Sequence, residues 1–316
     1  MRFLSLLLAP AAVACVALAP GDTVAVIGAS GNVGKLVALR LADTYSVRGV
    51  VRAADKVRPF LAAGAATSGA PGRTPVELFE ADLRGAGAEQ QLQAALQGVN
   101  GLVICTGTTA FPTKAWSQSE ESDVSGAVLQ ALWESSFDVG AAIESLDAQG
   151  LNTPRNVDAL GTKALLDAWA ASGAERKHCV LMSSIGVQRR TQMPFPILNT
   201  CGVLTAKAEG EDALKADAAD AGFSYTIVRP GQLFGGPYDN NYYLGTLFQL
   251  DKDAATQEVE MEGGDSLVGD TLRSTLAEVI AQTLESGSAL NSDFSVVNRK
   301  GSPPTVEALR KQLSAL

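Results

Sequence analysis

Short apolar runs alternate with amphipathic stretches along most of the chain. Between the runs, apolar residues recur at helical spacing, most clearly over 32–41, 88–96 and 206–221. Because strands that alternate with helices of this length pair in parallel through right-handed crossovers, the pattern predicts an α/β fold with a doubly wound parallel sheet. The expected strands cover residues 23–27, 46–51, 76–80, 101–105, 178–183 and 225–228.

The pattern is less regular in two places. A stretch rich in Gly, Ala, Pro and Thr over 62–75 predicts a loop before the third strand. From about residue 231 a loop with several Tyr and Gly residues begins, and we expect 231–316 to form a small substrate-side region of one domain that spans 22–316. The elements expected in this region are a helix over 271–284, a strand over 294–297 and a helix after Pro303 and Pro304.

One segment, residues 117–150, differs from the rest of the chain in charge. It carries seven Asp and Glu residues and no Lys or Arg, while Val124, Val128 and Leu132 repeat at helical spacing. The pattern predicts an acidic helical insertion after the fourth strand. A lid over a ligand site and a peripheral addition are both open interpretations, of which we favour the second. The acidic residues are Glu120, Glu121, Asp123, Glu134, Asp138, Glu144 and Asp147.

The first residues are typical of a targeting segment. After Arg2, residues 3–21 carry no charge and consist mostly of Leu, Ala and Val. A single cation followed by a short apolar stretch and small residues indicates a signal peptide. Pro10 and Pro20 disfavour a stable helix across a membrane. We therefore predict a signal or targeting segment over 1–21 and no stable membrane span after its removal.

Charge and composition exclude several classes of function. A net charge of −9 disfavours nucleic acid or an anionic membrane as the main partner, which leaves a small molecule or another protein. The four cysteines form no CxxC pair, and the single histidine, His178, cannot build a multi-histidine metal site. Without a nucleophile-elbow motif, His178 does not indicate a Ser-His-Asp triad either. The sequence predicts no metal.

A glycine-rich turn follows the first expected strand and opens the first expected helix. Its sequence, GASGNVG at 28–34, has glycines where a sharp turn, a close approach to a pyrophosphate and tight helix–strand packing require them. The helix N-terminus would then offer N–H groups to phosphates. The turn predicts a Rossmann-type dinucleotide-binding domain. Its expected cofactor-binding residues are Gly28, Ser30, Gly31, Asn32, Val33 and Gly34.

The ends of the next strands indicate which dinucleotide binds. A carboxylate after the second strand is typical of NAD enzymes, but this chain has Arg52 there. A guanidinium can form paired hydrogen bonds with a 2′-phosphate, so Arg52 favours NADP over NAD. After the third strand, Asp82 and Leu83 are placed to contact the adenine. After the fourth, Thr106 and Gly107 are expected beneath the cofactor.

These motifs and several later ones resemble one protein family. They are similar to atypical short-chain dehydrogenases/reductases of the NmrA-like, NAD(P)-binding group. The stretches TGTTAFP (106–112), PFPILNTCGVLTAKAEGED (194–212) and RPGQLFGGPY (229–238) further resemble NAD(P)-binding proteins of plant and algal plastids. The family motifs are GASGNVG (28–34), ADL (81–83), SSIGV (183–187), Lys207 with Glu211, and YTIVRPG (225–231).

The resemblance implies a catalytic pattern from which this chain departs. Reductases of the family place a tyrosine four residues before a lysine, and the phenol exchanges a proton with the substrate. Here Lys207 matches the lysine, but Val203 stands in place of the tyrosine. Ser183 or Ser184 matches the serine that polarises a carbonyl. The resemblance also implies that Lys207 anchors the cofactor ribose.

A proton donor would therefore have to come from another residue. The candidates are Thr205, Tyr238 and Lys207 itself. Two functions remain open: an NADP-dependent oxidoreductase with a non-standard proton donor, and a non-catalytic NADP-sensing scaffold or assembly factor. The leader and the resemblance together predict delivery to a plastid through the secretory route, with the cytoplasm as the alternative.

Overall fold

The described part of the structure covers most of the expected domain. The computed structural model describes residues 17–68, 74–85, 87–119, 122–235 and 255–316. Residues 1–16 of the expected leader and the candidate proton donor Tyr238 lie outside the described residues. Leu18, at the end of the same leader, is 7% exposed and packs against the apolar core. The chain therefore contributes to the core a few residues before position 22.

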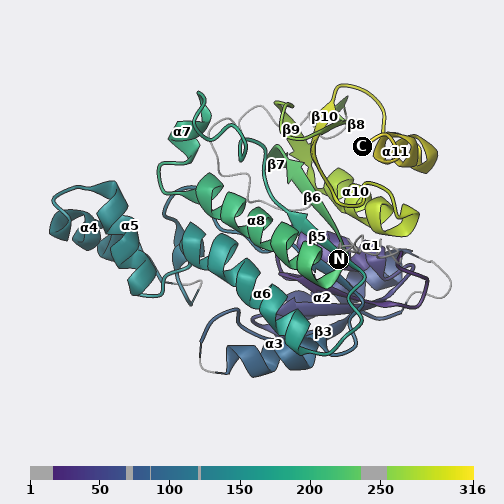
Figure 1. The fold of residues 1–316 in the computed structure, drawn as a ribbon, viewed down its shortest axis with the longest axis horizontal. Helices are drawn as coiled ribbons and strands as arrows, with labels where there is room; N and C mark the ends of the chain where they lie inside the picture. Colours follow the sequence, from purple (N-terminus) through teal and green to yellow (C-terminus); the bar gives the residue numbers. More distant parts are fainter. Residues whose placement is uncertain (1–16, 69–73, 86, 120–121, 236–254) are drawn as a thin grey trace, which may run out of the picture.

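A mostly parallel sheet forms the centre of the molecule (Figure 1). Its strands within the described residues are β1 (Thr23–Ile27), β2 (Ser46–Val51), β3 (Glu77–Glu80), β4 (Gly101–Ile104), β5 (His178–Met182), β6 (Ser224–Pro230), β8 (Glu258–Gly263) and β10 (Ser292–Arg299). They lie in the order β3-β2-β1-β4-β5-β6-β10-β8, and only β8 runs antiparallel to its neighbour. The winding direction reverses between β1 and β4, which opens a crevice at their carboxyl ends. The predicted doubly wound α/β fold is confirmed.

Alternate side chains of the strands enter two apolar layers. In β1, Val24 and Val26 pack on one face of the sheet and Ala25 and Ile27 on the other, because successive side chains of a strand point to opposite faces. The first face is covered by α1 (Gly34–Leu41), α2 (Ala54–Ser68), α10 (Arg273–Ser286) and α11 (Val306–Leu313). The second is covered by α3 (Ala88–Leu96), α6 (Leu160–Ala171) and α8 (Val203–Ala221).

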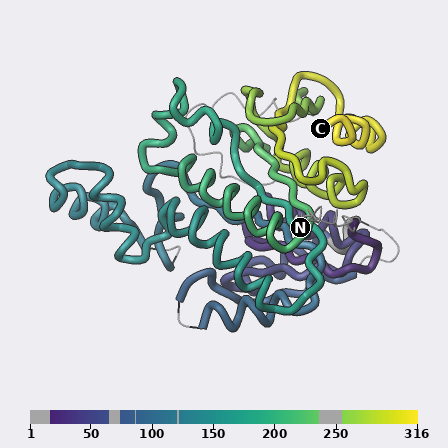
Figure 2. The backbone as a smooth tube through the Cα atoms, viewed as in Figure 1, coloured from purple at the N-terminus to yellow at the C-terminus, as the bar shows by residue number. Residues whose placement is uncertain are grey.

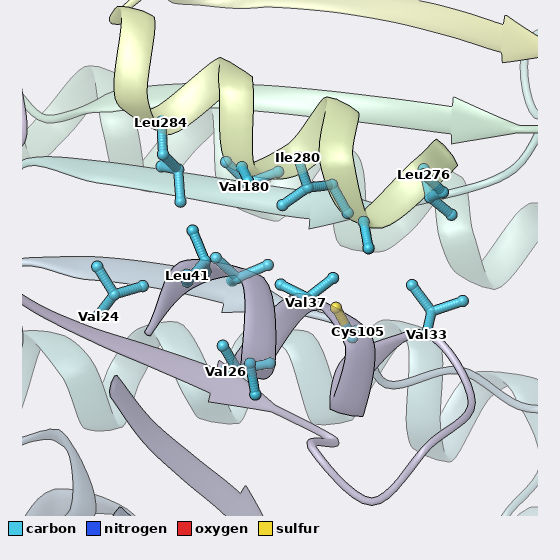
Figure 3. Packing of buried hydrophobic residues seen from close by; sticks show 14 of the residues in the cluster. Val24, Val26, Val33, Val37, Leu41, Cys105, Val180, Leu276, Ile280 and Leu284 are labelled. Carbon is cyan, nitrogen blue, oxygen red and sulfur yellow. The ribbon is translucent and has the colours of Figure 1, made fainter. Parts of the chain in front are cut away.

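The first layer joins the glycine turn to the rest of the core. Figure 3 shows Val37 and Leu41 of α1 between the strands and α10, which contributes Ile280 and Leu284. Val33, directly after the glycine turn, is 4% exposed and belongs to the same cluster. The N-terminus of α1 is therefore held against the sheet by apolar packing on both sides.

The structure corrects the first part of the loop predicted over residues 62–75: residues 62–68 are helical, 69–73 lie outside the described residues, and 74–75 have no regular structure. Helix α2 continues to Ser68 because four alanines, the best helix formers, surround Gly64 in this stretch. An added Cβ at Gly64 would come within 2.4 Å of a methyl carbon of Leu39 in α1. The glycine that suggested a loop instead allows α1 and α2 to approach each other closely.

Several elements have no counterpart among those expected from the sequence. Helix α6 carries Leu165, Leu166 and Trp169 into the second layer. Strand β8 has the charged sequence EVEMEG, which its position at the edge of the sheet permits. A separate parallel pair consists of β7 (Gln232–Phe234) and β9 (Asp270–Leu272). A short helix, α7 (Phe195–Leu198), precedes α8.

The acidic segment contains two helices that project from the body of the molecule. They are α4 (Ser125–Glu134) and α5 (Val139–Ala148), which we call the α4–α5 hairpin, and both figures show it at one end of the long axis (Figures 1 and 2). Its apolar cluster joins the body through Trp116 and Cys201. Among the helices in the described ranges, none combines the length and the apolar character that crossing a bilayer requires.

Candidate functional site

A cavity of about 460 Å³ lies at the carboxyl ends of β1 to β4. This is where the sheet reverses its winding direction, and where open α/β sheets bind their ligands. Most of the predicted cofactor residues line it, whereas Asn32, Val33, Gly34 and Lys207 are not part of its wall. Those that line it are Gly28, Ser30, Gly31, Arg52, Asp82, Leu83, Thr106 and Gly107.

The glycine turn shapes the floor of this cavity. Gly28 has a φ of +78°, a backbone conformation that side chains rarely permit. A Cβ at Gly34 would lie 2.2 Å from the carbonyl oxygen of Gly28, so only glycine allows α1 to begin against the turn. No side chain caps the N-terminus of α1. The N–H groups of Lys35 and Leu36 donate to the carbonyl oxygens of Gly31 and Val33, so α1 offers a phosphate chiefly the positive end of its dipole.

Three cationic side chains line the cavity beyond β2 and β3: Arg52, Lys56 and Arg84. Burial is the main cause that lowers the pKa of Arg84; the charge of Asp82 opposes this effect and that of Arg52 adds to it. Glu80, at the end of β3, accepts a hydrogen bond of 2.7 Å from the backbone N–H of Ala54 and so caps α2. This arrangement favours an anionic ligand group.

Lys56 and Arg84 were not among the residues predicted for the site. Arg84 donates hydrogen bonds to the carbonyl oxygen of Leu151 and to the side chain of Asn152, which follow the α4–α5 hairpin. Asn152 itself lines the cavity, together with Gln118. The base of the acidic insertion thus forms one wall of the site. Its contribution depends on contacts between distant segments, which no local motif signals.

The wall beyond β4 carries an orphaned polar atom. Thr108 lines the cavity, and its buried hydroxyl oxygen has no hydrogen-bond partner among the described residues. Such a group is costly unless a ligand or water satisfies it. Together with the glycine turn and the neighbouring cations, it meets the requirements of a phosphate- and ribose-bearing ligand. The residues present therefore fit a dinucleotide.

Lys207 lies at the edge of this wall and forms a buried ion pair. Its ammonium donates a hydrogen bond of 2.7 Å to Asp158, which comes from the short π-helix η2 (Arg155–Ala159). A Cβ at Gly107, which lines the cavity, would lie 3.3 Å from the Lys207 nitrogen, so the ammonium lies close to this part of the wall. Burial raises the pKa of Asp158 above its usual value, against the opposing effect of Lys207.

The two serines predicted to act on a substrate carbonyl are directed elsewhere. The Ser183 hydroxyl donates a hydrogen bond of 2.5 Å to Glu211, and the Ser184 hydroxyl donates to the carbonyl oxygen of Ile185. Neither serine lines the cavity. Because the Ser183 proton is held by Glu211, this hydroxyl can accept but not donate a further hydrogen bond in the observed arrangement.

Glu211 belongs to a buried network that the sequence did not reveal. It accepts two hydrogen bonds from Arg229, whose side chain is fully buried and also pairs with Asp293. Burial alone would lower the pKa of Arg229, but the hydrogen bonds and charges of Glu211 and Asp293 raise it. The network links Ser183, directly after β5, to α8, β6 and β10.

The position of the missing tyrosine is apolar. Val203 is 5% exposed and packs with Val187, Phe195 and Leu204. Thr205, one of the alternative proton donors, is exposed and accepts a hydrogen bond from the amide of Asn199. Among the described candidates, only Lys207 therefore brings an exchangeable proton to the edge of the cavity.

Comparison with known proteins agrees with this geometry. No curated protein matches the chain in sequence. A putative NAD-dependent epimerase/dehydratase from Bacillus halodurans has a TM-score of 0.56 at 19% identity, over 93% of this chain and 100% of its own. An oxidoreductase from Lactococcus lactis has a TM-score of 0.57 at 15% identity, over 93% and 97%. A short-chain dehydrogenase/reductase from Veillonella parvula in complex with NADP has a TM-score of 0.50 at 12% identity, over 90% and 99%.

At such identities these likenesses show the fold alone, and the family is shown by a sequence profile. The profile of the family described as NAD(P)H-binding matches residues 28–286, which begins at the glycine turn and ends with α10. The resemblance to NAD(P)-binding proteins is thereby confirmed, whereas the narrower likeness to plastid members stays a prediction. The chain belongs to the NAD(P)H-binding family.

Proposed function

We propose that this protein is an NADP-dependent oxidoreductase that acts on a small or medium-sized carbonyl or enone compound. The observation that carries the proposal is the group of cations, Arg52, Lys56 and Arg84, in the wall beyond β2 and β3. Paired hydrogen bonds from a guanidinium suit a 2′-phosphate, and the nearby carboxylate of Glu80 is engaged by Ala54 instead. The NADP complex of the Veillonella protein supports the same choice.

Lys207 is the residue to which we assign the proton. When bound, NADP supplies or accepts the hydride, so the protein needs only to bind the substrate and move a proton. Asp158 accepts one of the three ammonium protons of Lys207, which leaves two for a ribose hydroxyl and a substrate oxygen. Asp158 also holds the lysine charge in place. In this assignment the Lys207 ammonium supplies the proton that the tyrosine phenol supplies in other reductases of the family.

A second candidate function, an NADP-sensing scaffold, has its own supporting observation. The base of the α4–α5 hairpin contributes Gln118 and Asn152 to the cavity wall, and Arg84 bonds to the same segment. A ligand in the cavity would therefore contact the element that projects furthest from the body. In this case NADP would alter the hairpin without turnover.

Turnover separates the two candidates. We expect purified protein to oxidise NADPH in the presence of a member of a carbonyl and enone panel, and Lys207→Met to lower kcat by about 100-fold or more. Lys207→Arg keeps the charge and the contact to Asp158 and serves as the matched variant for binding. The loss of NADPH absorbance measures the turnover of the parent protein and of both variants. If NADPH binds but no panel member is turned over, the scaffold is the better account.

A further inference from the structure

Two exposed apolar patches lie toward the same end of the molecule. The first, which we call the tip patch, consists of Leu129, Trp133 and Phe137 on the α4–α5 hairpin, with exposed fractions of 67%, 75% and 68%. The second, which we call the α7 patch, consists of Met193, Ile197 and Leu198, at 72%, 56% and 43%. Figure 1 shows the hairpin at the far left of the view and α7 at its upper left, both away from α10 and α11. Apolar clusters exposed in this way mark interaction surfaces.

The tip patch is held in its exposed position by unusual backbone. Ser136 and Phe137 have φ values of 55° and 65°, in the left-handed region that non-glycine residues rarely adopt. The Phe137 N–H donates a hydrogen bond of 2.7 Å to the Leu132 carbonyl, and the Phe137 ring meets Trp133 edge to face at 6.1 Å. The turn thus keeps both aromatic rings at the tip, facing solvent.

The two patches have opposite charge. Glu134 and Asp138, both exposed, directly follow Trp133 and Phe137 of the tip patch, in a segment without Lys or Arg. The α7 patch lies in a stretch that has no Asp or Glu from residue 176 to 208. Arg190, three residues before Met193, donates to a backbone carbonyl and forms no ion pair with any described residue, whereas Arg189 is paired with Asp265. Arg190 is therefore the cation that the α7 patch offers.

From this complementarity we infer that the protein forms a twofold dimer in which the tip patch of each copy docks on the α7 patch of the other. Contact between two acidic tips would be repulsive, whereas tip against α7 pairs aromatic and aliphatic side chains and brings Glu134 toward Arg190. In a twofold dimer the same pair of surfaces meets twice, so two such contacts form at once. The patch side chains of both copies, when buried in the two contacts, remove on the order of 1,500 Å² from solvent, which is the size of a stable interface.

The dimer would bring a partner's tip close to the substrate side of the site. Phe195 of α7 packs against Val203, the residue in the tyrosine position, within one apolar cluster. The hairpin base, at the opposite end of the hairpin from the tip patch, lines the cofactor cavity through Asn152. The proposed contact therefore touches the substrate side of the site through α7, and it stands independently of the proposed oxidoreductase activity.

Sedimentation equilibrium of the full chain tests the dimer. We expect a concentration-dependent dimer, and a dissociation constant raised at least tenfold by Trp133→Ser, because buried tryptophans dominate interface energies. Arg190→Glu and Glu134→Arg should each weaken the dimer, and the two changes together should restore it. Asp138 is not used, since it caps α5 through the N–H of Ala141. Glu144→Arg, an equal charge change on an exposed site of α5, is the matched control and should leave the dimer intact.

Three outcomes would overturn the inference. A chain that remains monomeric at about 100 times a micromolar dissociation constant has no such dimer, and its patches then bind a different protein. A dimer that ignores Arg190→Glu and Glu134→Arg uses another surface. A dimer that each change weakens but the pair does not restore places the tip against a surface other than α7. Unchanged melting temperature and NADPH titration show that each variant is folded.

Discussion

His178 is a buried neutral base whose proton position follows from its surroundings. Its Nε2 lies 2.9 Å from the hydroxyl of Thr226, and that hydroxyl donates its only proton to the carbonyl oxygen of Ala289. Nε2 must therefore be the donor, which fixes the tautomer. Burial lowers the pKa of His178 to about 4. The role of this histidine is structural, because it is buried in β5 of the central sheet.

This environment predicts a pH-dependent stability. Between pH 6.5 and 4 the unfolded chain binds a proton at His178 more readily than the folded chain does, so the free energy of unfolding falls as the pH falls. The expected slope is about 1.4 kcal/mol per pH unit. Urea denaturation at pH 7 and pH 5 measures it. His178→Gln, whose amide can donate to Thr226, should lack this slope, and an identical pH dependence in both proteins would contradict the account.

Single residues also show what the sequence could not predict about the site. Arg229 stands in the apolar run YTIVRPG, and its presence there was the only local signal of a buried charge. Its partners Glu211 and Asp293 come from α8 and β10, so the ion pairs depend on how distant elements pack. Glu211 also accepts the hydrogen bond of the Ser183 hydroxyl, so the sequence identified the serine but not the partner that orients it. The lysine was identified without its partner Asp158.

At the scale of elements, two glycines at helix starts have different roles. Gly34 begins α1, where an added Cβ would lie 2.2 Å from the Gly28 carbonyl oxygen. Gly126, in the first turn of α4, has no atom within 4 Å of an added Cβ. The first glycine is required by a close approach of two backbone segments, whereas the second is not. Only the surrounding structure distinguishes them.

A pair of alanine substitutions tests this distinction. We expect Gly34→Ala to lower the free energy of unfolding by about 1–3 kcal/mol and to weaken NADPH binding at least about tenfold, because the turn must move. Gly126→Ala should raise stability by about 0.5–1 kcal/mol and leave binding unchanged. Thermal unfolding and a fluorescence titration with NADPH measure both. Equal effects of the two substitutions would show that the turn tolerates a side chain.

Element prediction succeeded where periodicity was strong and failed where tertiary packing decided. The glycine turn, β1 and α1 follow from local sequence. Helix α2 was expected to stop early because Gly64 looks like a breaker, yet its lack of a side chain serves contact with Leu39. The edge strand β8 has too many charges to be recognised as a strand. The acidic segment was recognised as helical, but its exposed tip requires the left-handed residues Ser136 and Phe137.

On the scale of the whole molecule, the site follows from topology. The sequence predicted a doubly wound sheet, and such a sheet binds its ligand at the carboxyl ends of the strands where the winding reverses. The cavity lies there, and its walls include the glycine turn, Arg52 and Asp82 as expected. The wall formed by Gln118 and Asn152 at the hairpin base could not be predicted, because it joins segments separated by the whole insertion.

The central claim is that the cavity binds NADP through the cations beyond β2 and β3, and calorimetric titration with NADPH and NADH tests it most directly. We expect NADPH to bind at least about tenfold more tightly than NADH, since each hydrogen bond to a charged group contributes about 1.5–3 kcal/mol. Arg52→Ala should remove most of this preference with little effect on NADH. Arg58→Ala, an exposed arginine of α2 outside the cavity, should have no effect. Equal affinities for the two nucleotides, or binding of neither, would contradict the account.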